Sequence, residues 1–265
     1  MNEPTISVAL IAKNEAHNLD DYFKTIAPIC DELVVADTGS TDETWAKLEA
    51  WKATAPYPVI TFRHSELPFH FGRARNETIK RATKDYVFLL DADERLTPGF
   101  ASKIKKFLAE KDPLAVVFQR QDDITPHLID HQTRIYKNDG HMPYSTASAN
   151  PLHEVLMLRE PAIWFDEIIV HHQGKSHWIN DHDRFFFYLM REVGRKENTA
   201  GFFREFMRAN LGFLYTFRKE YFRKQTYKDG RNGFKYTFLR AFSAYLEHFF
   251  IGLKPRVKPH DKDNH

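Results

Sequence analysis

The chain has 265 residues, which is enough for one large α/β domain, or for a moderate domain with an appended helical region. Its 38 Lys and Arg residues against 36 Asp and Glu give a net charge of +2, which by itself carries no nucleic-acid signature. A single cysteine, Cys30, excludes an internal disulfide framework and a cysteine-based zinc site within this sequence, and it suits a reducing compartment.

The first residues carry neither the basic nor the apolar segment of a signal peptide. No uninterrupted apolar run approaches the roughly 20 residues that a membrane-spanning helix needs. We therefore expect a cytoplasmic protein.

Strand and helix patterns alternate along the first half of the chain. Apolar runs predict strands at 6–12, 33–36, 59–63 and 86–90. Helical patterns lie between them at about 17–27, through Trp45, Leu48 and Trp51 immediately after the second strand, and at 73–82. Ser40 and Glu43 have the spacing of a capping box before the second helix. A helix at 98–110 and strands at 114–118 and 162–170 follow. This order predicts a doubly wound, mostly parallel α/β sheet.

Polar side chains follow three of these strands. Asn14 and Glu15 follow the first, Asp37 the second, and Asp91 and Asp93 the fourth. An isolated Asp-x-Asp is more often a solvated turn, but three such clusters at the ligand-binding edge of one sheet favour one pocket. No glycine-rich phosphate-binding loop is present, so a nucleotide held by these residues would need a metal ion to neutralise its phosphates.

Four segments carry a family resemblance in both order and spacing. They resemble the motifs of family 2 glycosyltransferases with the GT-A fold, and within that family those of bacterial lipopolysaccharide-core β-glucosyltransferases. The segments are Val8-Ala9-Leu10-Ile11-Ala12-Lys13-Asn14-Glu15, Val34-Val35-Ala36-Asp37-Thr38-Gly39-Ser40-Thr41-Asp42-Glu43-Thr44, Ala74-Arg75-Asn76-Glu77 and Leu89-Leu90-Asp91-Ala92-Asp93-Glu94. The resemblance is strong over 5–100, thinner to about 175, and weak beyond.

The resemblance implies a role for each matching residue. Asp37 matches an acid that contacts the uracil or ribose of a UDP-sugar, and Arg75 matches an arginine near the base. Asp91 matches an acid that contacts the ribose. Asp93 matches the ligand of an Mg²⁺ or Mn²⁺ ion that bridges the diphosphate, a task for which carboxylate oxygens are suited. Glu94 receives no catalytic role and is expected to begin the next turn.

The acceptor region is expected at about 119–177. Glu154 is the candidate general base, because an inverting transfer needs a group that takes the proton of the attacking hydroxyl; a structural ion pair with Arg159 is the alternative. Arg134 could reach a phosphate or the acceptor, or form an ordinary ion pair. His172 matches a strand-end histidine that completes the metal site or contacts the diphosphate, although a lone histidine there is more often structural.

The segment 178–253 is expected to be helical, aromatic-rich and basic. Between 218 and 240 it has eight basic residues against Glu220 and Asp229. Aromatic residues among cations suit the surface of an anionic membrane, and the alternative is a subdomain that packs its aromatics on the sheet and solvates its basic face. No recognition motif for nucleic acid accompanies this patch, so no nucleic-acid partner is expected. The tail 254–265 is expected to be disordered.

The combined interpretation is a catalytic GT-A domain over 1–177 followed by this helical region. It predicts transfer of a hexose, with glucose favoured, from a UDP-sugar to a hydroxyl of a cell-envelope saccharide or glycolipid such as lipopolysaccharide core, at the cytoplasmic face of the inner membrane. A sugar nucleotidyltransferase and a non-catalytic, membrane-associated nucleotide-sugar-binding module are the alternatives. The 14 histidines also make a zinc enzyme a weak alternative, but no His-Glu-x-x-His motif supports it.

Overall fold

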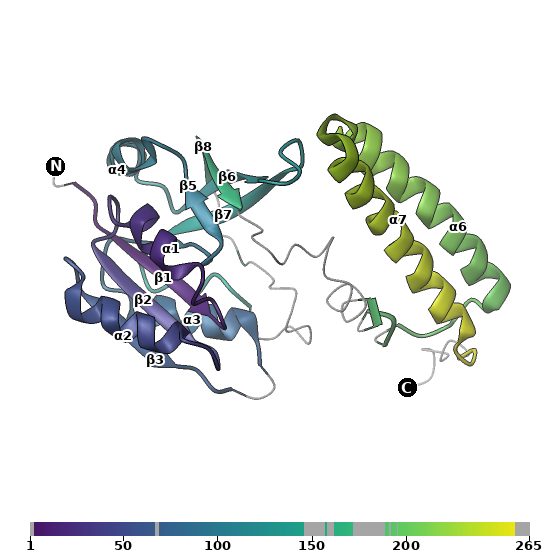
Figure 1. Cartoon of the computed structure of the whole chain (residues 1–265), viewed down its shortest axis with the longest axis horizontal. Helices are drawn as coiled ribbons and strands as arrows, with labels where there is room; N and C mark the ends of the chain where they lie inside the picture. The colour runs from purple at the N-terminus through teal and green to yellow at the C-terminus, as the bar shows by residue number, and fades with distance from the viewer. Residues whose placement is uncertain are drawn as a thin grey trace, which may run out of the picture. The chain divides into compact units, whose positions relative to one another are not determined.

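The chain divides into two compact units. The computed structural model describes residues 3–66, 69–145, 157, 162–171, 189–190, 192–194 and 196–257. The first unit comprises Met1–Arg120 and Asp130–His172, and the second comprises Gln121–Ile129 and Gln173–His265. Their elements are labelled in Figure 1.

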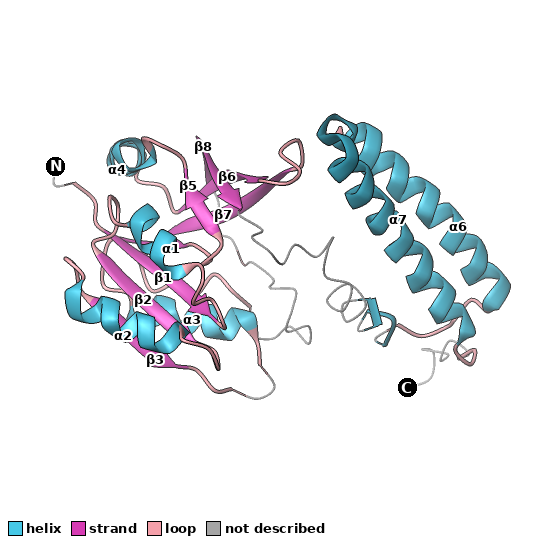
Figure 2. Ribbon diagram, in the orientation of Figure 1, coloured by secondary structure: helices cyan, strands magenta, loops and turns pink. Residues whose placement is uncertain are grey.

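An eight-stranded mixed sheet forms the centre of the first unit (Figure 2). Its strand order is β3-β2-β1-β4-β7-β6-β8-β5. Strands β1 to β4 run parallel to one another, whereas β4 pairs with β7, and β5 with β8, in antiparallel fashion. The strands are β1 (Ile6–Ala12), β2 (Glu32–Asp37), β3 (Val59–Arg63), β4 (Tyr86–Leu89), β5 (Glu94–Leu96), β6 (Ala115–Asp122), β7 (Ile129–Lys137) and β8 (Ala162–His171). The expected α/β sheet is therefore confirmed, and its parallel part is formed by β1 to β4.

Helices cover both faces of the parallel strands. They are α1 (Leu19–Ile26), α2 (Thr44–Thr54), α3 (Phe71–Arg81) and α4 (Phe100–Lys111). Val8 and Leu10 pack in the same core as residues of α1, α2 and α4, whereas Ala9 packs in a second core with Ile79 of α3. Because successive strand residues point to opposite faces and both faces of β1 are covered, β1 is apolar at every position except Ser7. This explains the uninterrupted apolar runs in the sequence.

Three local features differ from expectation. The polar stretch 119–150 contains the end of β6 and all of β7, which neighbour each other in the sheet, and Glu94 begins the short strand β5. The prediction of a capping box is wrong, because Glu43 is itself the N-cap residue of α2 and its side chain makes no capping hydrogen bond. The Ser40 hydroxyl instead accepts a hydrogen bond from the Asn14 backbone N–H at 3.0 Å.

The second unit contains a helical hairpin. Helix α6 (Phe202–Arg218) continues into a π-helical turn, η2 (Lys219–Arg223), and a 3₁₀ turn, η3 (Thr226–Asp229), leads into α7 (Gly230–Leu253). Rings of the two long helices meet along their length, with Phe213 and Phe238 centred 6.0 Å apart and Phe202 and Phe249 6.4 Å apart. The helical, aromatic-rich character expected for this region is confirmed.

The turn between the two helices is held by close contacts. The Thr226 hydroxyl donates to the Glu220 carbonyl at 3.0 Å. A Cβ atom on Gly233 would lie 1.7 Å from the Thr226 carbonyl oxygen, so only glycine fits there. At the start of the expected tail, the Val257 N–H donates to the Asn198 carbonyl at 2.9 Å, and residues 258–265 lie outside the described part of the chain. Among the described helices, none combines the length and apolar character needed to cross a bilayer.

Candidate active site

The polar residues that follow β1, β2 and β4 lie at one edge of the sheet. Ala12 at the end of β1 is paired with Asp37 at the end of β2, and β4 runs parallel to β1 on its other side. Burial raises the pKa of Glu15, and the negative charges of Asp93 and Asp91 add to this effect. The structure thus brings the acidic residues after β1 and β4 close enough to interact.

Asn14 and Glu15 connect the loops at this edge. Asn14 has a φ of 59°, in the left-handed region that Asn tolerates, and its side-chain oxygen accepts the Thr41 N–H at 2.8 Å. The Glu15 N–H donates to the Thr44 hydroxyl at 2.8 Å, and its carboxylate accepts from the Asn18 side chain at 2.7 Å. Both residues therefore organise the loops after β1 and β2.

The two carboxylate oxygens of Asp37 lie in different surroundings. Its Oδ1 accepts the backbone N–H groups of Gly39 at 2.9 Å and Ser40 at 2.8 Å. Its Oδ2 is buried and accepts no hydrogen bond within the described part of the chain. A buried carboxylate oxygen without a donor is unfavourable, so this atom marks a position where a ligand hydrogen-bond donor would be stabilising.

Asp91 lies between two arginines. Arg75 Nη1 of α3 is 2.9 Å from Asp91 Oδ1, and Arg134 Nη2 of β7 is 3.1 Å from Asp91 Oδ2. Burial would raise the pKa of Asp91, but the two positive charges outweigh it and hold this pKa well below its usual range. Asp91 is therefore a carboxylate in a positively charged setting, and Arg75 is adjacent to it.

Glu94 and Arg134 form a buried pair behind this turn. The Glu94 side chain is fully buried, and its Oε1 contacts the Arg134 guanidinium. Its Oε2 accepts the Asp91 N–H at 2.9 Å, and the Glu94 N–H donates to the Asp91 carbonyl at 3.0 Å. Glu94 thus closes the turn that carries Asp91 and Asp93. Of the roles that the sequence suggests for Arg134, the structure shows an ion pair.

Asp93 is partly exposed on the turn between β4 and β5. Within the described residues no group of three His, Cys, Asp or Glu side chains could hold a metal ion. Mg²⁺ and Mn²⁺ need fewer protein ligands when phosphates supply the remaining oxygens, and Mg²⁺ is often held by one or two carboxylates. The carboxylate of Asp93 therefore fits a cation that binds together with a diphosphate.

The candidate base Glu154 and the candidate ligand His172 lie outside the described residues. The ends of the segment around Glu154 are nevertheless fixed. The Met157 N–H donates to the Pro143 carbonyl at 2.8 Å, and Asn76 of α3 donates to the Tyr144 carbonyl at 2.8 Å. Pro143, Tyr144 and Met157 are therefore held beside α3, the helix that carries Arg75.

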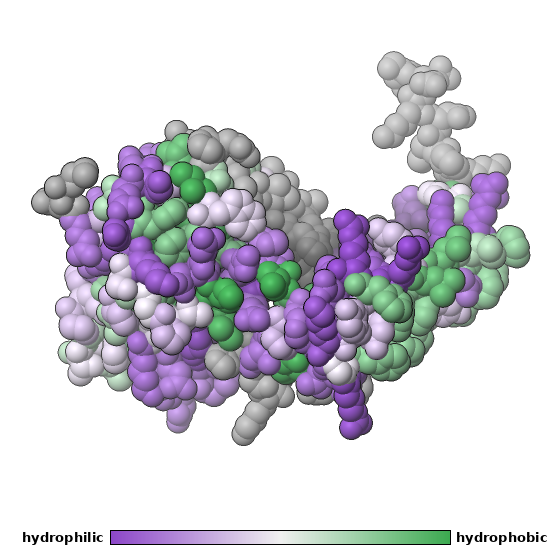
Figure 3. Space-filling view, turned by 90° about the horizontal axis from the view of Figure 1, so that it is seen from above, coloured by the Kyte–Doolittle hydropathy of each residue, from purple (hydrophilic) through white to green (hydrophobic). Residues whose placement is uncertain are grey.

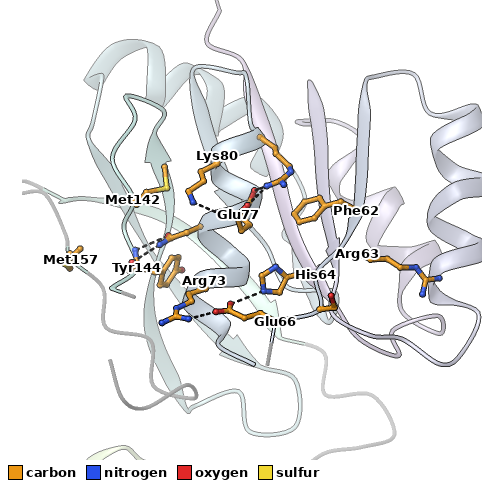
Figure 4. Close-up of a pocket in the computed structure, with 13 residues that line it drawn as sticks. Phe62, Arg63, His64, Glu66, Arg73, Glu77, Lys80, Met142, Tyr144 and Met157 are labelled. Atoms are coloured by element: carbon orange, nitrogen blue, oxygen red, sulfur yellow. Dashed lines mark hydrogen bonds and ion pairs between the residues drawn. The ribbon is translucent and has the colours of Figure 1, made fainter. Parts of the chain in front are cut away.

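A groove of about 780 Å³ lies along α3 (Figure 4). Its charged side chains pair with one another: Glu77 contacts Lys80 and Arg81, each at 2.6 Å, and Arg73 contacts Glu66. Asp37, Asp91 and Asp93 are not among the residues that line it. The groove nevertheless borders the candidate active site, because the N–H of its lining residue His64 donates to the Asp37 carbonyl at 2.8 Å and its lining residue Asn76 follows Arg75 on α3.

The family of this chain follows from comparison with known sequences. The model described as glycosyl transferase family 2 matches residues 7–166, more than half of the chain, so the chain belongs to this family. The SPbeta prophage-derived glycosyltransferase SunS of Bacillus subtilis is 24% identical over 177 residues, which are 64% of this chain and 40% of SunS. A TPR repeat-containing protein of Synechococcus elongatus is 31% identical over 117 residues, which are 44% of this chain and 27% of that protein. The match spans less than half the length of either relative.

Solved structures agree with this assignment at the level of the fold. The mannosyltransferase PcManGT from Pyrobaculum calidifontis, in complex with GDP-Man and Mn²⁺, superposes with a TM-score of 0.51 at 16% identity, over 92% of this chain and 74% of that one. The sheet topology and the family match together confirm the expected GT-A fold.

Proposed function

We propose that this chain is an inverting glycosyltransferase that uses a UDP-sugar. The observation that carries the proposal is the buried, unpartnered Oδ2 of Asp37 at the sheet edge where Asp91 and Asp93 also lie. A uracil N–H or a ribose hydroxyl would supply the missing donor. The family membership supports the reaction type, and the fold neighbour from Pyrobaculum calidifontis binds a nucleotide sugar together with Mn²⁺.

The donor diphosphate is proposed to bind beside Asp93. A divalent cation, Mg²⁺ or Mn²⁺, would bind there through Asp93 and neutralise charge as UDP leaves. Asp91 would accept ribose hydroxyls while Arg75 and Arg134 keep it ionised. His172 is proposed as a further ligand because it follows His171, whose backbone pairs with Glu94, the residue after Asp93.

The general base is proposed to be Glu154. Its carboxylate would take the proton of one acceptor hydroxyl as that oxygen bonds to C1 of the sugar and the bond from C1 to the diphosphate breaks on the opposite side. This single displacement gives a β-linkage. The anchoring of Pro143, Tyr144 and Met157 beside α3 supports the assignment, because the guanidinium carbon of Arg75 lies 5.9 Å from the Tyr144 ring and Arg75 itself contacts Asp91.

The transferred sugar is proposed to be a hexose, glucose, and the acceptor a hydroxyl of a cell-envelope saccharide or glycolipid such as lipopolysaccharide core. Both choices rest on the motif resemblance. The proposal also includes a cytoplasmic location with the second unit at the inner-membrane surface, where a lipid-linked acceptor would be carried.

A product assay tests the proposed function. The purified chain is incubated with UDP-glucose, UDP-galactose or UDP-N-acetylglucosamine, Mn²⁺ and envelope saccharides, and the products are identified by mass spectrometry. We expect UDP and a saccharide heavier by one hexose. Pyrophosphate formed from UTP and a sugar phosphate would identify a nucleotidyltransferase instead, and UDP binding without any product would identify a binding module. Envelope saccharides from a deletion strain should lack the same hexose.

A further inference from the structure

The helical hairpin exposes apolar side chains on the side of α6 that α7 does not cover. We define the α6 outer face as Phe203, Met207, Leu211, Leu214 and Tyr215. Their spacing of three to four residues places them on one side of the helix, and between 45% and 73% of each residue is exposed. Hydrophobic side chains alternate with hydrophilic ones over the hairpin in Figure 3. This face is too apolar for a solvated surface.

Positive charge surrounds the α6 outer face. Residues 201–240 contain ten Lys and Arg residues but three acidic residues. Each of the three acidic side chains is almost fully buried and has a cationic or histidine partner: Glu205 lies 2.8 Å from His248, Glu220 lies 3.1 Å from Lys224, and Asp229 lies 2.6 Å from His127. The exposed charges of this segment are therefore all positive.

Three arginines lie close to the apolar residues along the helix. Arg204, Arg208 and Arg218 are exposed. Arg218 follows Leu214 by four positions and Tyr215 by three, so its stem lies beside them on the helix surface. An arginine stem can cover apolar surface while its guanidinium reaches a neighbouring polar layer. The combination suits a boundary between an apolar and an anionic phase.

We propose that the α6 outer face docks on a bilayer that contains anionic phospholipids. The apolar side chains would enter the outer part of the acyl layer, and Arg204 and Arg218 would contact the headgroups. The hairpin would lie in the plane of the surface. This deepens the proposed function, on which it rests for its biological purpose, because a docked second unit holds the enzyme near a lipid-linked acceptor.

Charge argues against two other occupants of this face. A second copy packed through the same face would bring Arg204, Arg208 and Arg218 of both copies together, and repulsion between like charges disfavours such an interface. A nucleic-acid backbone would satisfy the arginines but would leave Leu211 and Leu214 in contact with water or phosphate. An anionic bilayer satisfies both the charge and the apolar residues.

Vesicle co-sedimentation of the full chain tests the docking, without donor or acceptor. We expect binding to vesicles of phosphatidylcholine with phosphatidylglycerol, and much weaker binding to phosphatidylcholine alone. Arg204→Glu with Arg218→Glu should lower the partition coefficient at least about twentyfold, since each cation near the surface contributes roughly fivefold. Leu211→Ser with Leu214→Ser should lower it about tenfold or more.

Matched substitutions in the first unit serve as controls. Trp164 is 54% exposed on β8, and Lys111 is exposed at the end of α4. Trp164→Ser and Lys111→Glu should keep wild-type vesicle binding. Thermal melts followed by circular dichroism establish that each variant is folded, and all the substituted positions are exposed.

Several results would overturn the docking proposal. Equal binding to both vesicles, or binding to neither, would do so. Two further results would also overturn it. One is a dimer, and the other is a complex with an oligonucleotide, in each case lost in the Leu211→Ser/Leu214→Ser variant while vesicle binding is retained. UDP release from a soluble donor is measured on the same variants. Loss of vesicle binding with retained UDP release is the expected outcome, whereas UDP release absent from every protein, wild type included, would contradict the proposed function and not the docking.

Discussion

Arg134 of β7 binds the fully buried carboxylate of Glu94, which in turn accepts the backbone N–H of Asp91. The turn between β4 and β5 carries Asp91 and Asp93. A buried ion pair between residues of two different strands therefore holds this turn in place. A buried charge that loses its partner is strongly destabilising. We infer that Glu94 positions the acidic turn without touching the substrate.

Glu94→Gln tests whether Glu94 positions Asp93 or only stabilises the fold. The amide removes one of the two negative charges that Arg134 contacts and leaves Asp91, so we expect the free energy of unfolding to fall by about 2 kcal/mol. If Glu94 also positions Asp93, the Mn²⁺ concentration for half-maximal UDP release should rise about tenfold. Urea unfolding and Mn²⁺ titrations measure the two effects.

The surface carboxylate of Glu77 is the control for Glu94. It contacts Lys80 and Arg81 on the exposed side of α3. Glu77→Gln should change the free energy of unfolding by less than about 1 kcal/mol and leave the Mn²⁺ dependence unchanged. A Glu94→Gln enzyme that loses stability but keeps the wild-type Mn²⁺ dependence would reduce Glu94 to a structural role.

Asp37→Asn tests the nucleoside contact. The amide oxygen can still accept the N–H groups of Gly39 and Ser40, so the fold should persist, but the unpartnered Oδ2 is replaced by a donor. We expect the Kd of UDP to rise about tenfold or more, measured by calorimetry without metal. Asp123→Asn, at an exposed position, should bind UDP like the wild type. Equal affinity for both variants would remove Asp37 from the nucleotide site.

The pH dependence of stability should report on Asp91. Because Arg75 and Arg134 outweigh the effect of burial, the pKa of Asp91 is lower in the folded chain than in the unfolded chain. Its stabilising contribution is therefore complete above the unfolded pKa of about 4 and is lost as the pH falls towards the folded value. Urea unfolding between pH 2 and 6 should show a steeper acid decline for the wild type than for Asp91→Asn, and parallel profiles would contradict this.

The parallel half of the fold could be predicted from the sequence because burial on both faces leaves a simple signal. All seven residues of β1 are apolar apart from Ser7, and Cys30 is buried as a small apolar side chain. Strand β7 escaped prediction because Asp130, His131 and Gln132 at its start are polar and at least partly exposed. Strand β5 has three residues, too few for a periodic pattern.

The candidate site was predictable only in part, for a similar reason. Asp37, Asp91 and Asp93 stand at strand ends, so alternation of elements was enough to bring them to one edge. The pairing of Glu94 with Arg134 joins residues that are 40 positions apart across an antiparallel part of the sheet, and no local spacing encodes it. Ser40 was assigned to a helix cap, but it contacts Asn14 in a neighbouring loop.

The most direct test of the proposed mechanism is sugar transfer by Asp93→Asn. The substitution keeps the size of the side chain and removes the charge proposed to hold the cation, so the protein should melt like the wild type. We expect hexose transfer and UDP release to be abolished at every Mg²⁺ and Mn²⁺ concentration, with UDP binding in the absence of metal retained. Wild-type turnover by the folded Asp93→Asn enzyme would contradict a metal-assisted transfer at this site.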